Sequence, residues 1–402
     1  MAPVPILRLI TWLPSGGIER KIAAVLPRLD RSRFEPHVCC IRERGPLADE
    51  LERSGVPVHV IPFRGRMDPV GLWRLSGLVR RIGARIVHAH MYRSNTPATL
   101  LKLRNDGLSV IGHYHNVDTW ETRRQRWLDG YLARRRDMNI AVSEAVRRDV
   151  LRTLGLPDSA VRTLHNGVDL DEFRPLPAAD RRAVRLRLGA DVPPDAPLSV
   201  CVARLVKAKN QALLIQAAAE LRADVPDARH VLVGAGPDEA RLRALAGELG
   251  VADRVIFLGR RDDVPALLAA ADVAVLPSLR EGFSNAVLEA LACGVPVLAS
   301  DVGGNAEVLD PGVNGYLCRV APKGAPDETD PDDAPYGRDH GSTPHTDLQV
   351  NAGQFTRHLR RLLTDAPLRS RMGAAARASA EDFGIDRMVS DVERLYTELL
   401  TQ

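Results

Sequence analysis

The chain has 402 residues, of which 45% are hydrophobic and 26% are charged, a composition typical of a soluble globular protein. This length is more than one hydrophobic core usually serves, so we expect two domains. No apolar run is long enough to cross a bilayer, and the N-terminal residues are predicted to form a strand and a turn, not a signal peptide. The five cysteines show neither metal-ligand spacing nor a paired framework, which indicates a reduced, cytoplasmic protein.

The net charge of +4 is unevenly distributed along the chain. Residues 1–150 hold 26 Lys and Arg against 15 Asp and Glu, a charge of +11, whereas residues 201–402 carry −7. A basic half usually has an anionic partner, such as a membrane surface, nucleic acid or a phosphorylated acceptor. Nearly all of this charge is Arg, so genome composition can also contribute to the excess.

Short apolar runs alternate with helical patterns through the first half, which is typical of a parallel α/β sheet. Ser143 is predicted to cap a helix over 144–154. We predict strands over 5–12, 37–40, 58–62, 85–90, 108–115, 138–142 and 161–164.

A pair of glycines, Gly16 and Gly17, separates the first strand from a helical pattern that starts at Ile18. Strand, glycine turn and helix are how a doubly wound unit begins, and glycines let a ligand approach the backbone. A plain tight turn explains the same residues. The GxGxxG fingerprint is absent, so an NAD site receives little support.

Four histidines, His88, His90, His113 and His115, fall at or near the ends of two predicted strands. Open α/β sheets bind ligands beyond the carboxyl ends of their strands. A metal site is a second interpretation, but no carboxylate or Cys accompanies the histidines in register. Pairs at i and i+2 can also simply share one face of a strand.

Residues 120–137 (WETRRQRWLDGYLARRRD) combine arginines with aromatic residues. A helix on a membrane surface has this composition, and so does a solvated helix that packs its apolar stripe on the domain, which we favour. Further along, five prolines between residues 175 and 197 indicate a linker.

The second half begins again with a strand over 198–202, followed by Arg204 and Lys209 before an apolar helix. Two cations at the end of a sheet can bind a phosphate, although for the pair alone two surface cations in a loop are the default interpretation. Further candidate positions at strand ends are Gly234, Gly236 and Arg260.

The segment REGFSNAVLEALACGVPV, residues 280–297, follows another predicted strand. Ser284 is a good N-cap, and the helix after it should end at Gly294. Glu281 lies in the loop and Glu289 in the second turn, so both can face a ligand at the start of the helix. Unpaired N–H groups and the helix dipole favour an anion there. Carboxylates that can bind hydroxyls, beside a phosphate site, indicate a ligand with both hydroxyls and phosphates, of which a nucleotide sugar is one example.

Residues 321–350 are rich in Pro, Gly and Asp, and they are longer than a normal connection. We expect a flexible acidic insertion, without the residue order of a calcium-binding loop. Helices are predicted after it over 355–363, 368–379 and 388–400.

The stretch EGFSNAVLEALACGVPVLASDVGGNAEVL resembles the Glu-x7-Glu signature of retaining glycosyltransferases of the GT-B fold, family 4 type. The resemblance implies two Rossmann-like doubly wound domains that face each other across a cleft, with a C-terminal helix crossing back to the first domain. The implied limits are 1–178 for an acceptor domain, 179–380 for a donor domain and 381–402 for the returning helix.

The resemblance also implies roles for individual residues. Arg204 and Lys209 match the family's diphosphate clamp, Glu281 would hold the donor sugar, Glu289 the ribose, and His115 would contact a sugar. The implied catalytic residues are His115, Glu281, Arg204 and Lys209. The implied donor-binding residues are Gly16, Gly17, Arg204, Lys209, Gly234, Gly236, Arg260, Glu281, Gly282, Phe283, Ser284, Asn285 and Glu289.

The resemblance implies a metal-independent, retaining hexosyltransferase with no cofactor, which takes a nucleotide sugar, in the first place a UDP-sugar, to a glycan or lipid-linked acceptor. Cell-surface polysaccharide or lipopolysaccharide synthesis is the expected setting. The expected location is cytoplasmic, with the anionic inner-membrane surface as a candidate partner of the basic half and no nucleic acid. A nucleotide-sugar 2-epimerase and a non-catalytic nucleotide-sugar-binding protein remain alternatives.

Overall fold

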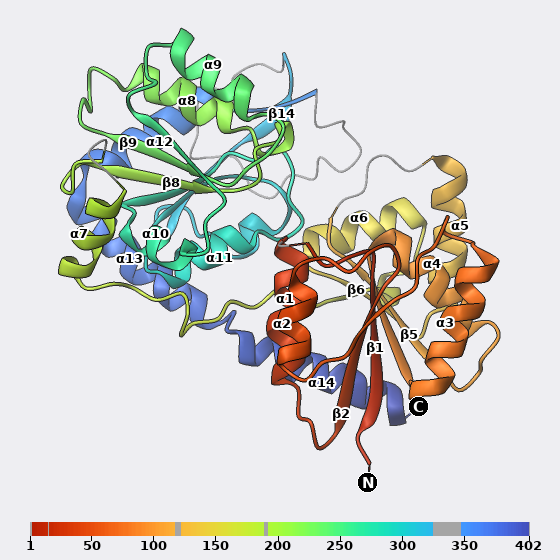
Figure 1. Ribbon diagram of the computed structural model, residues 1–402. Helices are drawn as coiled ribbons and strands as arrows, with labels where there is room; N and C mark the ends of the chain where they lie inside the picture. Colours follow the sequence, from red (N-terminus) through yellow and green to blue (C-terminus); the bar gives the residue numbers. More distant parts are fainter. Residues whose placement is uncertain (1, 15, 117–121, 189–191, 325–346, 402) are drawn as a thin grey trace. The chain divides into compact units, whose positions relative to one another are not determined.

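We analysed a computed structural model that describes residues 2–14, 16–116, 122–188, 192–324 and 347–401. The chain divides into two compact units (Figure 1). The first domain comprises Met1–Gly167 together with Ile385–Gln402, and the second domain comprises Val168–Gly384. Among the described helices, none is both long and apolar enough to span a membrane.

The first domain contains a seven-stranded sheet in the order β3-β2-β1-β4-β5-β6-β7, and its described strand pairs are all parallel. Strand β1 is buried along most of its length, as expected for a parallel sheet covered on both faces. The predicted strands are confirmed, with ends that differ by at most three residues. The strands are β1 (Val4–Ile10), β2 (Phe34–Cys40), β3 (Val58–Val60), β4 (Ile86–His90), β5 (Ser109–Tyr114), β6 (Met138–Ala141) and β7 (Arg162–Thr163).

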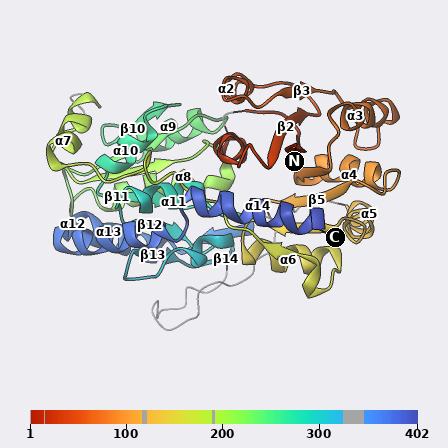
Figure 2. The ribbon, with the colours of Figure 1, turned by 90° about the horizontal axis from the view of Figure 1, so that it is seen from below.

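Helices cover both faces of this sheet. Ile6 and Ile10 pack with α1, α2 and α14, whereas Leu7 and Leu9 pack with α3 and α4, because successive side chains of a strand point to opposite faces. The chain's last helix, α14, lies against the first of these faces (Figure 2). The helices are α1 (Gly17–Val25), α2 (Leu47–Arg53), α3 (Pro69–Ile82), α4 (Met91–Lys102), α5 (Arg123–Ala133), α6 (Glu144–Leu154) and α14 (Ile385–Thr401), with short 3-10 turns at Leu26–Arg28 and Asp158–Ala160.

The second domain contains a six-stranded parallel sheet in the order β10-β9-β8-β11-β12-β13. Helices α8, α9 and α12 contribute to one large apolar core with this sheet. Its strands are β8 (Leu198–Val202), β9 (Arg229–Val233), β10 (Val255–Gly259), β11 (Val273–Leu276), β12 (Val297–Ser300) and β13 (Gly315–Cys318). Its helices are α7 (Ala178–Arg187), α8 (Gln211–Glu220), α9 (Glu239–Glu248), α10 (Val264–Ala270), α11 (Asn285–Ala292), α12 (Ala352–Thr364) and α13 (Ala366–Glu381), with 3-10 turns at Lys207–Lys209 and Gly303–Glu307.

The predicted acidic insertion has ordered ends. Strand β14 (Val320–Pro322) pairs antiparallel with β15 (Leu348–Val350), where the sequence had led us to expect a loop. Leu348 and Val350 are buried in the core of the second domain, so these two apolar residues anchor the ribbon. Residues 325–346, the acidic part of the predicted insertion, lie outside the described residues.

Both sheets have a point at which the strand order reverses. In the first domain it lies between β1 and β4, and in the second between β8 and β11. The helices that follow two such strands leave toward opposite faces, which opens a crevice at the carboxyl edge of the sheet. The two domains therefore form the doubly wound architecture that the sequence predicted, and each offers one place where a ligand can bind.

Candidate active site

The four histidines of the sequence analysis form one buried cluster in the first domain. Strands β4 and β5 are neighbours, so His88, His90, His113 and His115 project from the same face. His88 Nε2 lies 3.1 Å from His113 Nδ1, and His90 Nδ1 lies 2.9 Å from His115 Nε2. The i, i+2 spacing thus does mean a shared face, as the sequence analysis considered.

Arg8 of β1 lies beside this cluster and determines its proton arrangement. Its guanidinium reaches His90 Nε2 at 2.9 Å and His88 Nε2 at 3.4 Å. A guanidinium can only donate, so His90 Nε2 accepts and the proton of His90 resides on Nδ1. That N–H donates to His115 Nε2, which leaves the His115 proton on Nδ1. His115 Nδ1 is buried and has no hydrogen-bond partner among the described residues.

The histidines of the cluster are held neutral. Burial, and next the charge of Arg8, lower the pKa of His115 to about 3. Burial likewise lowers the pKa of His88, His90 and His113 well below the usual value. A neutral His115 with an unpaired Nδ1–H is a fixed hydrogen-bond donor that can bind the oxygen of a ligand.

A metal is a poor fit to this cluster. Ligand atoms of His88, His90 and His113 do lie within 4.8 Å of one another. However, the Nε2 atoms of His88 and His90 already face the Arg8 guanidinium, and a second cation there would be repelled. We therefore interpret the cluster as a hydrogen-bonded network around a buried arginine.

In the second domain, Lys209 and Glu281 meet at the carboxyl edge of the sheet. Lys209 follows β8 and Glu281 follows β11, the two strands at the point where the order reverses. The Lys209 ammonium lies 2.5 Å from Glu281 Oε1, and the Glu281 side chain is only 9% exposed. The structure thus brings together two candidates that are 72 positions apart in the sequence.

The loops around this ion pair are locked to one another by their backbones. Leu279 N donates to the Ala208 carbonyl at 2.8 Å, and Leu205 N donates to the Ala235 carbonyl at 3.1 Å. The Gln211 side chain donates to the Arg204 carbonyl at 2.9 Å and orders the loop that carries this exposed arginine. The edge is therefore organised before any ligand binds, which reduces the ordering entropy that binding would otherwise require.

Two of the predicted glycines are needed for this packing. A Cβ atom at Gly234 would lie 2.0 Å from the Ala203 carbonyl oxygen, and one at Gly236 would lie 2.1 Å from that of Leu205. Gly234 also has a φ of +136°, which side chains disfavour. The structure thus explains both glycines by their close approach to the loop that carries Arg204.

Helix α11 begins at this edge as predicted. Ser284 is its N-cap and accepts a hydrogen bond from Val287 N at 3.4 Å, while Phe283 is buried beneath the loop. Asn285 starts the helix, and Glu289 lies half-buried in its second turn. The N–H groups at the start of α11 and the helix dipole make this end a favourable place for a diphosphate.

The remaining predicted residues are more dispersed. Arg260 is exposed just after β10, and Gly282 is buried in the loop between Glu281 and Phe283. Gly16 is the N-cap of α1 and Gly17 its first residue, both in the first domain. The structure thus gathers the donor candidates of the second domain around α11 and the β8 loop, and it places His115 and the glycine pair in the first domain.

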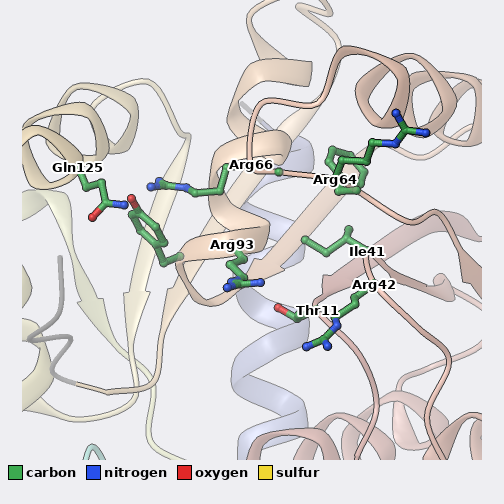
Figure 3. A pocket seen from close by; sticks show the side chains of 10 residues that line it. Thr11, Ile41, Arg42, Arg64, Arg66, Arg93 and Gln125 are labelled. Carbon is green, nitrogen blue, oxygen red and sulfur yellow. The ribbon is translucent and has the colours of Figure 1, made fainter. Parts of the chain in front are cut away.

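Sequence reasoning missed a cavity of about 440 Å³ in the first domain (Figure 3). It lies beyond the ends of β1, β2, β3 and β4, at the reversal point of this sheet, and four of its ten lining residues are arginines. No periodicity marks these residues, because they come from several segments that lie far apart in the sequence. A detectable signal was Met91-Tyr-Arg93 directly after the buried strand β4. The lining residues are Thr11, Ile41, Arg42, Phe63, Arg64, Gly65, Arg66, Tyr92, Arg93 and Gln125.

Two doubly wound parallel domains, each with a point at which its strand order reverses, form the GT-B architecture. Comparison with known proteins agrees. Residues 15–172 match the family described as Glycosyltransferase Family 4, and residues 189–325 match Glycosyl transferases group 1. The chain belongs to this family of glycosyltransferases.

Two relatives illustrate the breadth of the family. A GDP-mannose-dependent alpha-(1-6)-phosphatidylinositol monomannoside mannosyltransferase of Mycolicibacterium smegmatis is 35% identical over 262 residues, which are 63% of this chain and 61% of that protein. N-acetyl-alpha-D-glucosaminyl L-malate synthase of Bacillus anthracis is 30% identical over 333 residues, 81% of this chain and 78% of the relative.

Solved structures confirm the fold. HepE of Anabaena, determined in complex with UDP-glucose, superposes with a TM-score of 0.79 and 21% identity over 98% of this chain and 99% of that one. At this identity the likeness speaks for the architecture alone.

Proposed function

We propose that this protein is a retaining glycosyltransferase that moves a hexose from a nucleotide-diphosphate sugar to a glycan or lipid-linked acceptor without a metal ion. Cell-surface polysaccharide or lipopolysaccharide synthesis is the setting that we favour. Family membership supports the reaction type, and the mycobacterial relative supports the donor class through the GDP-mannose that its name states.

The observation that carries the proposal is the Lys209–Glu281 pair beside the start of α11. The leaving nucleotide diphosphate gains negative charge as the glycosidic bond breaks. Lys209, Arg204 and the N–H groups at the start of α11 would stabilise this charge as it develops, and such stabilisation is often the largest catalytic effect. Glu281 would then bind the donor sugar, and Glu289 the ribose hydroxyls.

The proton arrangement of the histidine cluster supports a role for His115 on the sugar side. Its Nδ1–H is fixed by the chain of hydrogen bonds from Arg8 through His90. A neutral donor can bind a sugar hydroxyl or ring oxygen without introducing a charge. In this proposal Arg8 and His90 are positioning residues, because they act on the ligand only through His115.

The test is a release assay with purified protein and a panel of UDP-, GDP- and ADP-sugars, without acceptor and without metal. Slow release of the nucleotide from one donor identifies that donor and supports a transferase awaiting its acceptor. A UDP-sugar is the donor that we favour, and GDP-mannose is its first competitor because of the mycobacterial relative.

The same assay separates the two alternatives if the sugar is followed as well as the nucleotide. Sugar that is isomerised while the nucleotide stays attached indicates a 2-epimerase. Binding of a donor with no turnover, even in the presence of candidate acceptors, indicates a non-catalytic binding protein. If the protein neither binds nor turns over any donor, the proposed use of Lys209 and Glu281 is contradicted.

We propose further that the protein is cytoplasmic and that it associates peripherally with an anionic membrane through α5. The sequence analysis favoured a helix whose apolar stripe packs on the domain. In the structure Leu132 is buried, but Trp127 is 71% and Tyr131 is 44% exposed. Arg123 and Arg124 are exposed on the same helix. Exposed aromatic rings beside arginines favour the interface of an anionic bilayer. Trp120 lies outside the described residues.

A further inference from the structure

We propose that the arginine-lined cavity of the first domain binds a phosphate group carried by the acceptor. The inference rests on the proposed function, because it names the chemical class of the acceptor for that reaction. The proposed ligand is a phosphorylated sugar or polyol, either free in solution or as the headgroup of a lipid.

Three of the four arginines of the cavity lack a close carboxylate partner among the described residues, and the fourth, Arg66, pairs with Asp129. None of the ten lining residues is acidic. Arg64 and Arg93 form no ion pair among the described residues, and Arg42 has only the exposed Glu43 at 3.8 Å. Like charges that share a cavity repel one another, so an anion that enters is attracted by all of them.

Arg66 has a different role from its neighbours. Its guanidinium donates to Asp129 at 2.7 Å and to Thr96, and it lies 3.0 Å from the centre of the Tyr92 ring. Asp129 is almost fully buried, so this arginine is neutralised and held in place. Arg66 therefore fixes the wall of the cavity and the Tyr92 ring, and the anion is left to the other arginines.

Arg42, Arg93 and Thr11 point into one part of the cavity, whereas Arg64 points away from them (Figure 3). These three residues come from the ends of β2, β4 and β1, so three separate elements supply donors to one place. A tetrahedral phosphate can accept from three directions at once, whereas a planar carboxylate is satisfied by one guanidinium fork. This convergence favours phosphate.

The position of Arg93 is explained by such a ligand. Arg93 lies in the first turn of α4, where the helix dipole is positive and a cation is unfavourable. The N-cap residue His90 provides no side-chain capping bond. A phosphate at this position would compensate both the arginine and the helix end.

The rest of the cavity suits a sugar or polyol. Phe63 and Tyr92 present aromatic surface, and the Tyr92 hydroxyl is buried without a hydrogen-bond partner among the described residues. Buried hydroxyls are rarely left unpaired, so a ligand hydroxyl is the partner that this oxygen lacks. A volume of about 440 Å³ accommodates a phosphorylated ring.

The first experiment measures binding of inorganic phosphate to the full chain by calorimetry. Arg42→Gln and Arg93→Gln should each weaken binding about tenfold, and the double variant about a hundredfold, because each removes one charge-assisted contact. Arg85→Gln is the matched control, since Arg85 is an exposed arginine of the same domain outside the cavity. It should bind phosphate as the wild type does.

Lys209→Ala distinguishes this cavity from the donor site, which can also attract phosphate. The cavity proposal requires that Lys209→Ala retains the binding event that the arginine variants weaken. Equal affinity in wild type and double variant, or loss of that event in Lys209→Ala alone, overturns the proposal. The measurement needs no turnover, so failure of the wild type to release nucleotide from any donor would contradict the proposed function separately.

A second set of probes identifies the source of the phosphate. Glycerol 3-phosphate and D-inositol 3-phosphate represent soluble acceptors, and phosphatidylcholine vesicles containing phosphatidylinositol represent a lipid headgroup. Binding of either kind that weakens in the double variant supports the proposal and names the source. The proposal is overturned if the double variant binds both kinds of probe as well as the wild type does, or if the wild type binds neither kind. If a donor is found, Arg93→Gln should raise the KM for a phosphorylated acceptor about tenfold and leave the KM for its phosphate-free counterpart unchanged.

Discussion

In the second domain the lysine at the reversal point has its carboxylate partner at 2.5 Å, whereas of the four cavity arginines in the first domain only Arg66 has a comparably close carboxylate among the described residues. The first domain also holds four buried neutral histidines around Arg8, whereas among the described residues of the second domain one histidine is buried, His230, which is bound to Ser199 at 2.8 Å. The same backbone architecture thus supports two different electrostatic designs. In the second domain Lys209 and Glu281 are already paired, so Lys209 must exchange partners when a ligand binds. The first domain instead holds hydrogen-bond donors and cations without a close partner among the described residues.

The largest expected difference between the domains is in their response to acid. Burial lowers the pKa of all four clustered histidines, to about 3 for His115, and that of His230 to about 4. In the unfolded chain they titrate near 6.5, so below that pH only the unfolded state gains protons. Stability is therefore complete above pH 6.5 and falls as the pH decreases, by about 1.4 kcal/mol per pH unit for each histidine.

The first domain contains four such histidines and the described part of the second contains one. The first domain should therefore lose its protection against hydrogen exchange first, between pH 6.5 and 5. Hydrogen exchange of peptides from β4 and β5 against peptides from β8 and β9, corrected for the intrinsic pH dependence, measures the difference. The second domain is the internal control. Equal loss in both domains would show that the cluster is already protonated in the folded protein.

Breaking the Lys209–Glu281 pair should have the next largest effect, a loss of turnover. Lys209→Ala removes the cation and leaves Glu281 buried without its partner, so turnover should fall about 10²- to 10³-fold. Glu289→Ala should reduce turnover by a similar factor through the ribose. Lys207→Ala is the matched control because Lys207 is exposed in the same turn. Near-normal nucleotide release in Lys209→Ala would remove the mechanistic basis of the proposed function.

Alanine variants of two glycines in the second domain compare backbone strain beside Glu281 with backbone strain away from it. Gly303 and Gly312 both have positive φ, +57° and +84°. A Cβ at Gly303 would lie 2.1 Å from the Glu281 carbonyl oxygen, whereas one at Gly312 would meet open space. Each alanine variant should lose about 1–2 kcal/mol of stability from its backbone conformation.

Only Gly303→Ala should also displace Glu281, and we expect at least a tenfold loss of turnover, since misplacement by about 1 Å is sufficient for larger losses. Thermal unfolding and nucleotide release of both variants are the measurements. Equal activity of the two variants would mean that the position of the Glu281 loop is unimportant for turnover.

The smallest expected effect concerns the membrane. Trp127→Ala should weaken binding to anionic vesicles about tenfold at low salt, because one exposed aromatic ring no longer inserts. Trp73→Ala is the control, since Trp73 is equally exposed, at 71%, on α3. Co-sedimentation at low and high salt checks both variants. A wild type that ignores anionic vesicles at low salt contradicts the membrane proposal.

Much of the architecture was predictable from local patterns. Buried strands appear as short apolar runs, Ser143 and Ser284 identify helix starts, and Gly294 marks a helix end with its φ of +70°. The acidic segment was harder, because the paired strands at its ends, β14 and β15, have only three residues each and no periodicity to reveal them.

The candidate site was predictable only where its residues lie in one motif. Glu281, Ser284 and Glu289 belong to a single loop and helix, so spacing was sufficient to propose that they share a ligand. The four arginines of the cavity come from three strand–helix connections between residues 42 and 93, and only the strand order places them together. For the same reason the sequence analysis gave Arg8 no role.

The sequence by itself determined the alternation of strands and helices, the two-domain organisation and the motif at α11, because periodicity, caps and turns act over a few residues. Tertiary structure alone decided that Lys209 pairs with Glu281, that Arg8 fixes the protons of His90 and His115, and that three arginines without a close carboxylate gather at the edge of the first sheet. Those properties depend on strand order and burial, and burial determines both which charges are unpaired and which imidazoles remain neutral.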